Sequence, residues 1–100
     1  MNDKLLSLLG IARRAGRLTL GFDAAADSMR NGRTKLLLLA GDLSERTVRS
    51  ISNTAQQTNT EIIRTDIPMQ QLGAAIGKAT GIISVNDAGF AGKLKTLCTE

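Results

Sequence analysis

The sequence predicts an α/β protein, a three-layer α/β/α sandwich around a mixed, mostly parallel sheet of four strands or slightly more. Short apolar runs alternate along the chain with segments in which apolar residues recur at helical spacing, which is the pattern of strand–helix units. The run Leu36–Ala40 is apolar throughout, as expected of an inner strand that is covered on both faces. No repeat, low-complexity tract or linker divides residues 1–100, and we therefore expect one domain.

The first third of the chain predicts a helix, a short strand and a second helix. The first helix is expected to begin at Asn2 or Asp3 and to end at Gly16, which can take the left-handed conformation after a last turn. A strand over 18–20 then leads to a helix over Phe22–Arg30. The residues expected to face inward are Leu5, Leu8, Leu9 and Ala12 in the first helix, and Phe22, Ala25, Ala26 and Met29 in the second.

The rest of the chain predicts three further helices and three strands, beginning with the apolar run described above. Ser44 is expected to cap a helix, and a strand over Glu61–Thr65 follows it. Pro68 fits the first turn of the next helix, which Gly77 weakens or ends before a fourth strand over Ile82–Val85. The residues expected to be buried in these helices are Val48, Ile51 and Ala55, then Leu72, Ala75 and Ile76, and finally Phe90, Leu94 and Leu97 in a helix that starts at Asp87.

The positive charge is concentrated in the first third of the chain. The 100 residues carry 13 Lys and Arg against 9 Asp and Glu, a formal charge of +4. Seven of these cations, against three aspartates, lie within residues 1–35, so that this segment alone accounts for the excess. Such an uneven distribution favours a localised anionic partner.

Several kinds of function are excluded or made improbable by composition. The chain has no His, and its one cysteine, Cys98, is expected to be a reduced thiol or a packing residue, so His-dependent catalysis, Cys-rich metal sites and disulfides are not expected. Two phenylalanines are too few for a base-stacking platform. No apolar run approaches the ~20 residues of a membrane helix, and no signal-peptide pattern is present. We therefore expect a cytoplasmic protein that is not an enzyme and uses no cofactor or metal.

A stretch from the end of the first helix to the start of the second combines cations with a helix N-terminus. Arg13, Arg14 and Arg17 lie close together, and Gly21 precedes the second helix, whose first N–H groups are free to bind an anion. Together they predict a cradle for phosphate. The alternative is that the arginines only compensate the negative end of the first helix.

Acidic residues follow three of the predicted strands. Asp42, Asp66 and Asp87 each come shortly after a strand, and the carboxyl ends of parallel strands line the usual ligand crevice of an α/β sheet. A magnesium or phosphotransfer pocket is therefore an alternative. The interpretation that we favour is that each aspartate caps or precedes its own helix.

Four stretches share their order and spacing with one known group of proteins. They are residues 8–18 (LLGIARRAGRL, followed by Gly21), 35–42 (KLLLLAGD), 72–78 (LGAAIGK) and 86–91 (NDAGFA). On these residues the chain resembles, over nearly its whole length, the bacterial YlxQ-type proteins of the kink-turn RNA-binding ribosomal protein superfamily. The resemblance implies the same α/β/α sandwich and RNA binding without catalysis.

The resemblance also implies where RNA would lie. In the family, RNA crosses the start of the second helix and the loop after the fourth helix. The matching positions here are Gly21, Phe22 and Asp23 at the first place, and Lys78, Ala79 and Thr80 at the second. The family's motif at the helix start is Gly, a small residue, Asn, Glu, two variable residues and Lys. Only the glycine is retained, because Asp23, Ala24 and Asp27 occupy the positions of Asn, Glu and Lys. A carboxylate at the last position would repel the RNA backbone.

These observations predict a non-catalytic RNA-binding protein, ribosomal or translation-associated. Its partner would be structured RNA, with rRNA and kink-turn RNA as the candidates, held mainly by phosphate contacts. We expect a monomer with no small-molecule substrate and no membrane contact. The alternative is a protein–protein adaptor on the same fold that has lost kink-turn binding, which the missing motif and the acids at Asp23 and Asp27 favour.

Overall fold

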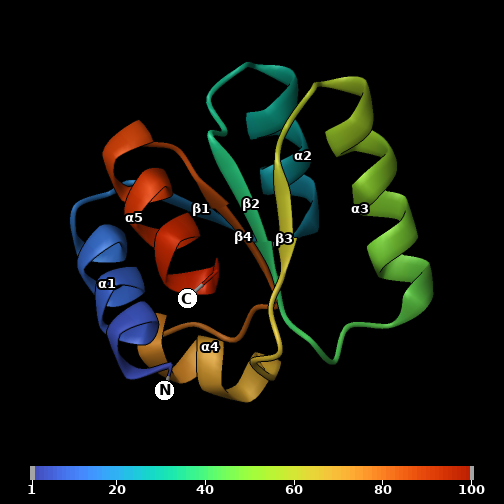
Figure 1. Cartoon of the computed structure of the whole chain (residues 1–100). Helices are drawn as coiled ribbons and strands as arrows, with labels where there is room; N and C mark the ends of the chain where they lie inside the picture. The colour runs from blue at the N-terminus through green and yellow to red at the C-terminus, as the bar shows by residue number, and fades with distance from the viewer. Residues whose placement is uncertain (1, 100) are drawn as a thin grey trace.

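The computed structural model describes residues 2–99, and over these residues the predicted sandwich is confirmed. Figure 1 shows one sheet with helices on both of its sides. The elements in chain order are α1 (Asp3–Arg14), β1 (Leu18–Leu20), α2 (Phe22–Arg30), β2 (Leu36–Leu39), α3 (Glu45–Gln57), β3 (Ile62–Arg64), α4 (Met69–Ile76), β4 (Ile82–Val85) and α5 (Ala88–Thr99).

Local signals in the sequence set several of the helix ends. Gly16 after α1 and Gly77 after α4 have φ values of +73° and +81°, the left-handed conformation that the two predicted stops require. The Ser44 hydroxyl accepts a hydrogen bond from the Thr47 N–H at 3.2 Å, which confirms the predicted cap of α3. Asn2 precedes α1, but its side chain accepts no hydrogen bond from the first turn.

The four strands lie in the order β1-β4-β2-β3. The strands β1, β2 and β3 run in one direction, and β4 lies antiparallel between β1 and β2. The sheet is mixed, as predicted, but only the β2–β3 pairing is parallel, so the prediction that it is mostly parallel is wrong. The connection through α4 explains this inversion. With eight residues α4 is about 12 Å long, and Figure 1 shows it below the edge of the sheet rather than across a face. The chain therefore enters β4 from the edge at which β3 ends.

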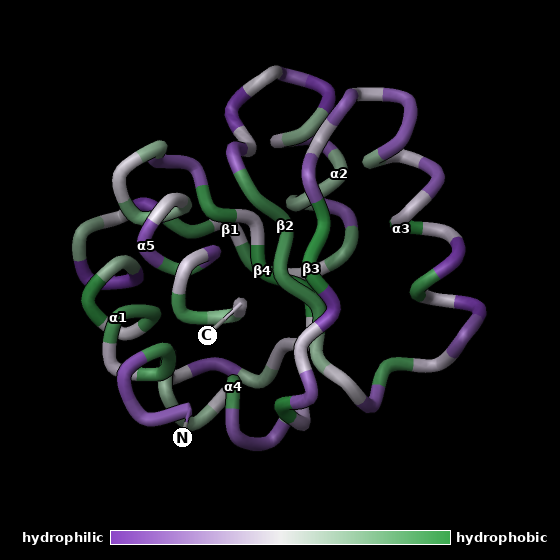
Figure 2. The backbone as a smooth tube through the Cα atoms, in the orientation of Figure 1, coloured by the Kyte–Doolittle hydropathy of each residue, from purple (hydrophilic) through white to green (hydrophobic). Residues whose placement is uncertain are grey.

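Each face of the sheet has its own apolar core. Leu36 and Leu38 of β2 pack with residues of α1, α4 and α5, whereas Leu37 and Leu39 pack with residues of α2 and α3. All four leucines are buried, which confirms β2 as an inner strand. Figure 2 shows the hydrophobic colour concentrated on the strands and the hydrophilic colour on the outer turns.

Phe22 was predicted to face inward, and this prediction is wrong. Its side chain is 36% exposed, and the buried residues of α2 are Ala25, Ala26, Ser28 and Met29. Phe22 is the first residue of α2, next to the point at which β1 ends, and helical side chains lean toward the helix N-terminus. The ring therefore projects beyond the sheet instead of onto it.

The amides of Leu37 and Leu38 are expected to exchange hydrogen for deuterium more slowly than almost all others in the protein. Their strand is paired on both sides and their side chains are fully buried, so exchange requires global unfolding. Hydrogen exchange followed by NMR checks this, with the amides of the edge strand β1 as the faster internal comparison. Equal rates in β1 and β2 would contradict the inner position of β2.

Candidate nucleic-acid interface

The end of β1 and the start of β4 meet at one edge of the sheet. The Gly21 N–H donates a hydrogen bond to the Ile82 carbonyl oxygen at 3.0 Å. This bond places the start of α2 beside the loop between α4 and β4, although about sixty residues separate them in the chain. We call this place the Gly21 edge and define it by residues 21–23 and 77–81. The two segments that the family resemblance implied as RNA contacts therefore lie together.

The first turn of α2 presents free backbone donors at this edge. Gly21 has a φ of +94°, which a residue with a Cβ rarely adopts, and it turns the chain from β1 into the helix. Within residues 2–99, the N–H groups of Phe22, Asp23 and Ala24 donate to no protein acceptor. These donors and the helix dipole favour an anion. The exposed carboxylate of Asp23 lies in the same turn and opposes it.

The loop after α4 packs tightly onto that helix. The N–H groups of Gly77 and Lys78 both donate to the Gly73 carbonyl oxygen, at 2.8 and 3.1 Å. A Cβ on Gly73 would lie 3.1 Å from the Ala79 Cα, so the glycine allows this close approach. An open groove of about 610 Å³ results, and its lining residues are Met69, Gln70, Gly73, Ala74, Gly77, Lys78, Ala79 and Thr80. Lys78 is the only cation among them and is exposed to solvent.

The loop between β2 and α3 extends the Gly21 edge. A Cβ on Gly81 would lie 2.7 Å from both the Leu43 Cδ2 and the Met69 Cγ, so these side chains cover the backbone there. The Asp42 carboxylate accepts a hydrogen bond from the Met69 N–H at 2.9 Å. The start of α4 is thus joined to the loop after β2.

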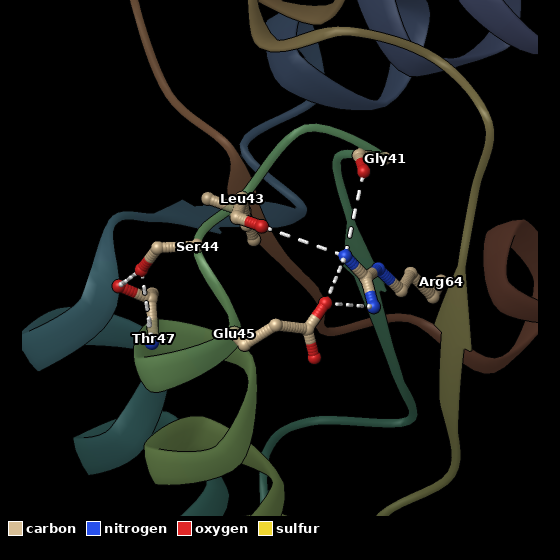
Figure 3. Close-up of polar contacts among 6 residues, drawn as sticks. All are labelled: Gly41, Leu43, Ser44, Glu45, Thr47 and Arg64. Carbon is tan, nitrogen blue, oxygen red and sulfur yellow. Dashed lines mark hydrogen bonds and ion pairs between the residues drawn. The ribbon is translucent and has the colours of Figure 1, made fainter.

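Arg64, at the end of β3, holds this loop in place (Figure 3). Its guanidinium donates to the carbonyl oxygens of Gly41 and Leu43, both at 3.4 Å, and to the Glu45 carboxylate at 3.3 Å. Sequence reasoning did not identify Arg64. An arginine that ends a short strand carries no local signal that it will bind the carbonyl groups of another loop.

The three arginines do not form one cradle with the start of α2. The three residues of β1 separate Arg17 from Gly21 by roughly 13 Å, at about 3.3 Å per residue. Arg17 lies at the opposite edge of the sheet, where its carbonyl oxygen accepts the Asn86 N–H at 2.8 Å. Arg14 lines a groove between α1 and α4. Arg13 is half-buried, and its Nη1 is buried without an acceptor among the described residues. The predicted single cradle is therefore wrong.

The acidic residues after the strands do not form a shared pocket. Asp42 and Asp66 follow strands that run one way, whereas Asp87 follows the antiparallel β4 and so lies at the other edge. Asp87 accepts a hydrogen bond from the Phe90 N–H at 2.8 Å and thus caps its own helix, as predicted. Asp42 instead caps α4, not the helix that follows it. Among residues 2–99 no three His, Cys, Asp or Glu side chains are grouped to hold a metal.

Cys98 is half-buried near the end of α5. Burial, and secondly the negative charge of Asp66, raise the pKa of its thiol. A raised pKa keeps the thiol neutral and weakly nucleophilic at neutral pH. Cys98 packs against the core on the α1, α4 and α5 face, in agreement with a packing role.

Comparisons with known proteins identify related chains. The profile of the ribosomal protein L7Ae/L30e/S12e/Gadd45 family matches residues 3–95. The RNA-binding protein YlxQ of Bacillus subtilis (strain 168) is 37% identical over 97 residues, with 90% of each chain covered. The large ribosomal subunit protein eL30 of Saccharomyces cerevisiae is 28% identical, with 89% of this chain and 87% of that protein covered.

Two solved structures have the same fold. A protein described as of unknown function from Bacillus halodurans C superposes with a TM-score of 0.91 at 35% identity, over 97% of this chain and 98% of that one. The Giardia lamblia 15.5kD RNA binding protein gives a TM-score of 0.75 at 18% identity, over 96% and 88% of the two chains. None of the helices within residues 2–99 is long and apolar enough to cross a membrane.

Proposed function

Because this chain belongs to the ribosomal protein L7Ae/L30e/S12e/Gadd45 family, we propose that it is a non-catalytic RNA-binding protein, ribosomal or translation-associated, whose RNA lies on the Gly21 edge. Relatives named as RNA-binding or as a large ribosomal subunit protein support this role. We further propose that residues 1–100 act as one RNA-binding domain and as a monomer that needs no cofactor.

The proposal rests on two complementary surfaces, the start of α2 and the loop after α4, which meet at the Gly21 edge. The unpaired N–H groups at the start of α2 suit an RNA phosphate, and Lys78 adds a cation on the neighbouring loop. The groove beside Lys78 is mainly apolar and can receive the sugar and base of the same nucleotide. Arg14 lies across α4 from this groove and extends the positive surface, since Ala74 lines both grooves.

Binding at this edge should depend on phosphates more than on bases. Asp23 and Ala24 are exposed in the first turn. Asp23 lacks the amide of the family motif's Asn, and Ala24 lacks the carboxylate of its Glu, which are the groups that read bases in the family. Asp27 is paired with Arg30 at 3.3 Å, so its charge is partly offset by its own helix. We therefore propose weakly selective binding in which a kink-turn is only slightly preferred over other structured RNA.

Replacing Lys78 with alanine is expected to lower affinity for a kink-turn, a plain duplex and a hairpin by similar factors. The slope of log K against log salt should fall by about one unit, because one phosphate contact is lost. Fluorescence anisotropy over a salt series measures both quantities. Lys93→Ala, which removes another exposed lysine, from the middle of α5, is the control and should change neither. Unchanged binding by Lys78→Ala would contradict this use of the loop.

A protein–protein adaptor remains the second candidate, and one observation favours it. Phe22 and Met69 are exposed large apolar residues on and beside the Gly21 edge, and such residues often anchor protein interfaces. The same RNA panel separates the two functions. Absence of binding to all three RNAs at low salt would leave the adaptor as the better proposal.

A further inference from the structure

The edge of the sheet opposite the Gly21 edge carries a second group of cations. Arg17 directly precedes β1 and Lys35 directly precedes β2, and the end of β4 lies between them. The Asn86 N–H donates to the Arg17 carbonyl oxygen, and the Lys35 N–H donates to the Val85 carbonyl oxygen, both at 2.8 Å. With neighbouring strands about 4.8 Å apart, the backbones of Arg17 and Lys35 lie roughly 10 Å from each other.

Three cations at this edge are free to bind an anion. Arg17, Arg33 and Lys35 are all exposed, and none forms an ion pair with another residue of the described chain. Arg33 belongs to the same loop as Lys35, and its N–H donates to the Ser28 carbonyl oxygen at 3.0 Å. We call the edge of the sheet that carries Arg17, Arg33 and Lys35 the Asn86 edge, after the residue whose N–H binds the Arg17 carbonyl oxygen.

The carboxylates at the same edge are already engaged. Glu61, which precedes β3, forms an ion pair with Lys95 of α5 at 2.9 Å. Asp87, which follows β4, accepts the Phe90 N–H at 2.8 Å. Neither acid forms an ion pair with Arg17, Arg33 or Lys35.

A partly buried hydrogen-bond network supports the backbone that carries these cations. The Asn86 side-chain oxygen accepts from the hydroxyls of Ser28 and Ser84, at 3.0 and 2.6 Å, and its amide nitrogen donates to the Thr19 hydroxyl at 2.7 Å. The Thr34 hydroxyl joins the network through Ser28 at 2.9 Å. Because Thr34 stands between Arg33 and Lys35, the loop with both cations is anchored to the sheet. No residue of this network belongs to the Gly21 edge, on which the proposed function depends.

We propose that the Asn86 edge is a second phosphate-binding surface, through which the protein bridges two RNA segments. This inference rests on the proposed function, in which the first RNA occupies the Gly21 edge. The exposed large apolar residues of the described chain are Ile11 on α1, Phe22 at the Gly21 edge and Met69 beside that edge, and none of them belongs to the segments that carry these cations. A protein partner would need such anchors, whereas a phosphate backbone needs only cations on a fixed frame.

A two-RNA capture experiment tests the proposal. A short kink-turn RNA is immobilised and loaded with the protein, unbound protein is removed, and a labelled RNA duplex is added at low salt. The unmodified protein should retain the duplex, and analytical ultracentrifugation should find one protein with two RNAs. The double variant Arg33→Ala/Lys35→Ala should still be captured but should retain at least tenfold less duplex, with a salt slope for this step lower by about two units.

A matched control separates this surface from general charge. Arg49→Ala/Lys93→Ala also removes one arginine and one lysine, both exposed and located in the middles of α3 and α5, and should retain the duplex fully. An equal loss in both double variants would overturn the second surface. So would capture of the unmodified protein without retention of the duplex, which would leave the proposed function intact. If the immobilised RNA captures no protein, the proposed function itself fails.

Discussion

Replacing Gly41 with alanine is expected to lower the free energy of unfolding by about 2–3 kcal/mol. A Cβ at this position would lie 2.8 Å from the Thr65 carbonyl oxygen and 3.1 Å from the Asp66 Cα. These are backbone atoms of the segment between β3 and α4, so they cannot rotate away as a side chain could. The Gly41 N–H also donates to the Ile67 carbonyl oxygen at 2.9 Å, so a backbone shift would lose this bond.

Urea denaturation measures this effect as a lower midpoint at an unchanged slope. Gly92→Ala is the matched control, because a Cβ at Gly92 meets no atom within 4 Å and the residue lies inside α5. Alanine should there raise stability by about 0.5–1 kcal/mol through its better helix propensity. If Gly41→Ala were as stable as the unmodified protein, the contact between these loops would be looser than the structure has it.

The triple change Asp23→Asn, Ala24→Glu and Asp27→Lys is expected to raise the preference for a kink-turn over a plain duplex by about tenfold to a hundredfold. It restores the groups with which the family motif reads bases, and a good base contact discriminates by about 1–3 kcal/mol. All three positions are exposed on α2, and the Asp27–Arg30 pair that is lost is a surface pair, so the fold should tolerate the changes.

Competition binding between the two RNAs measures the preference. Asp27→Asn alone is the control, since it removes the negative charge at the position of the family motif's Lys without adding a base-reading group. It should raise affinity for both RNAs by a similar factor and leave the preference unchanged. If the triple variant also raised the affinity for both RNAs by the same factor, the start of α2 would not read bases. Kink-turn recognition at the Gly21 edge would then be excluded.

The candidate site could be predicted in its parts but not in its arrangement. Gly21 and Lys78 were identified from motifs, and the Gly21–Ile82 hydrogen bond brings their segments together as the family resemblance implied. Arg17 was grouped with Gly21 because they are near in sequence, yet an extended strand carries neighbours to opposite edges of a sheet. Arg64 was missed because its partners come from another loop.

The local structure of this protein follows from short segments of its sequence. Periodicity and backbone conformation are properties of one segment, and they predicted β1, α2 and β4 with their observed bounds and the helix stops at Gly16 and Gly77. The antiparallel position of β4 between β1 and β2 is set instead by tertiary packing. Strand order and direction depend on pairing between distant segments, which no local pattern encodes. That single inversion placed Asp87 away from Asp42 and Asp66, and it joined Arg17 and Lys35 through the end of β4.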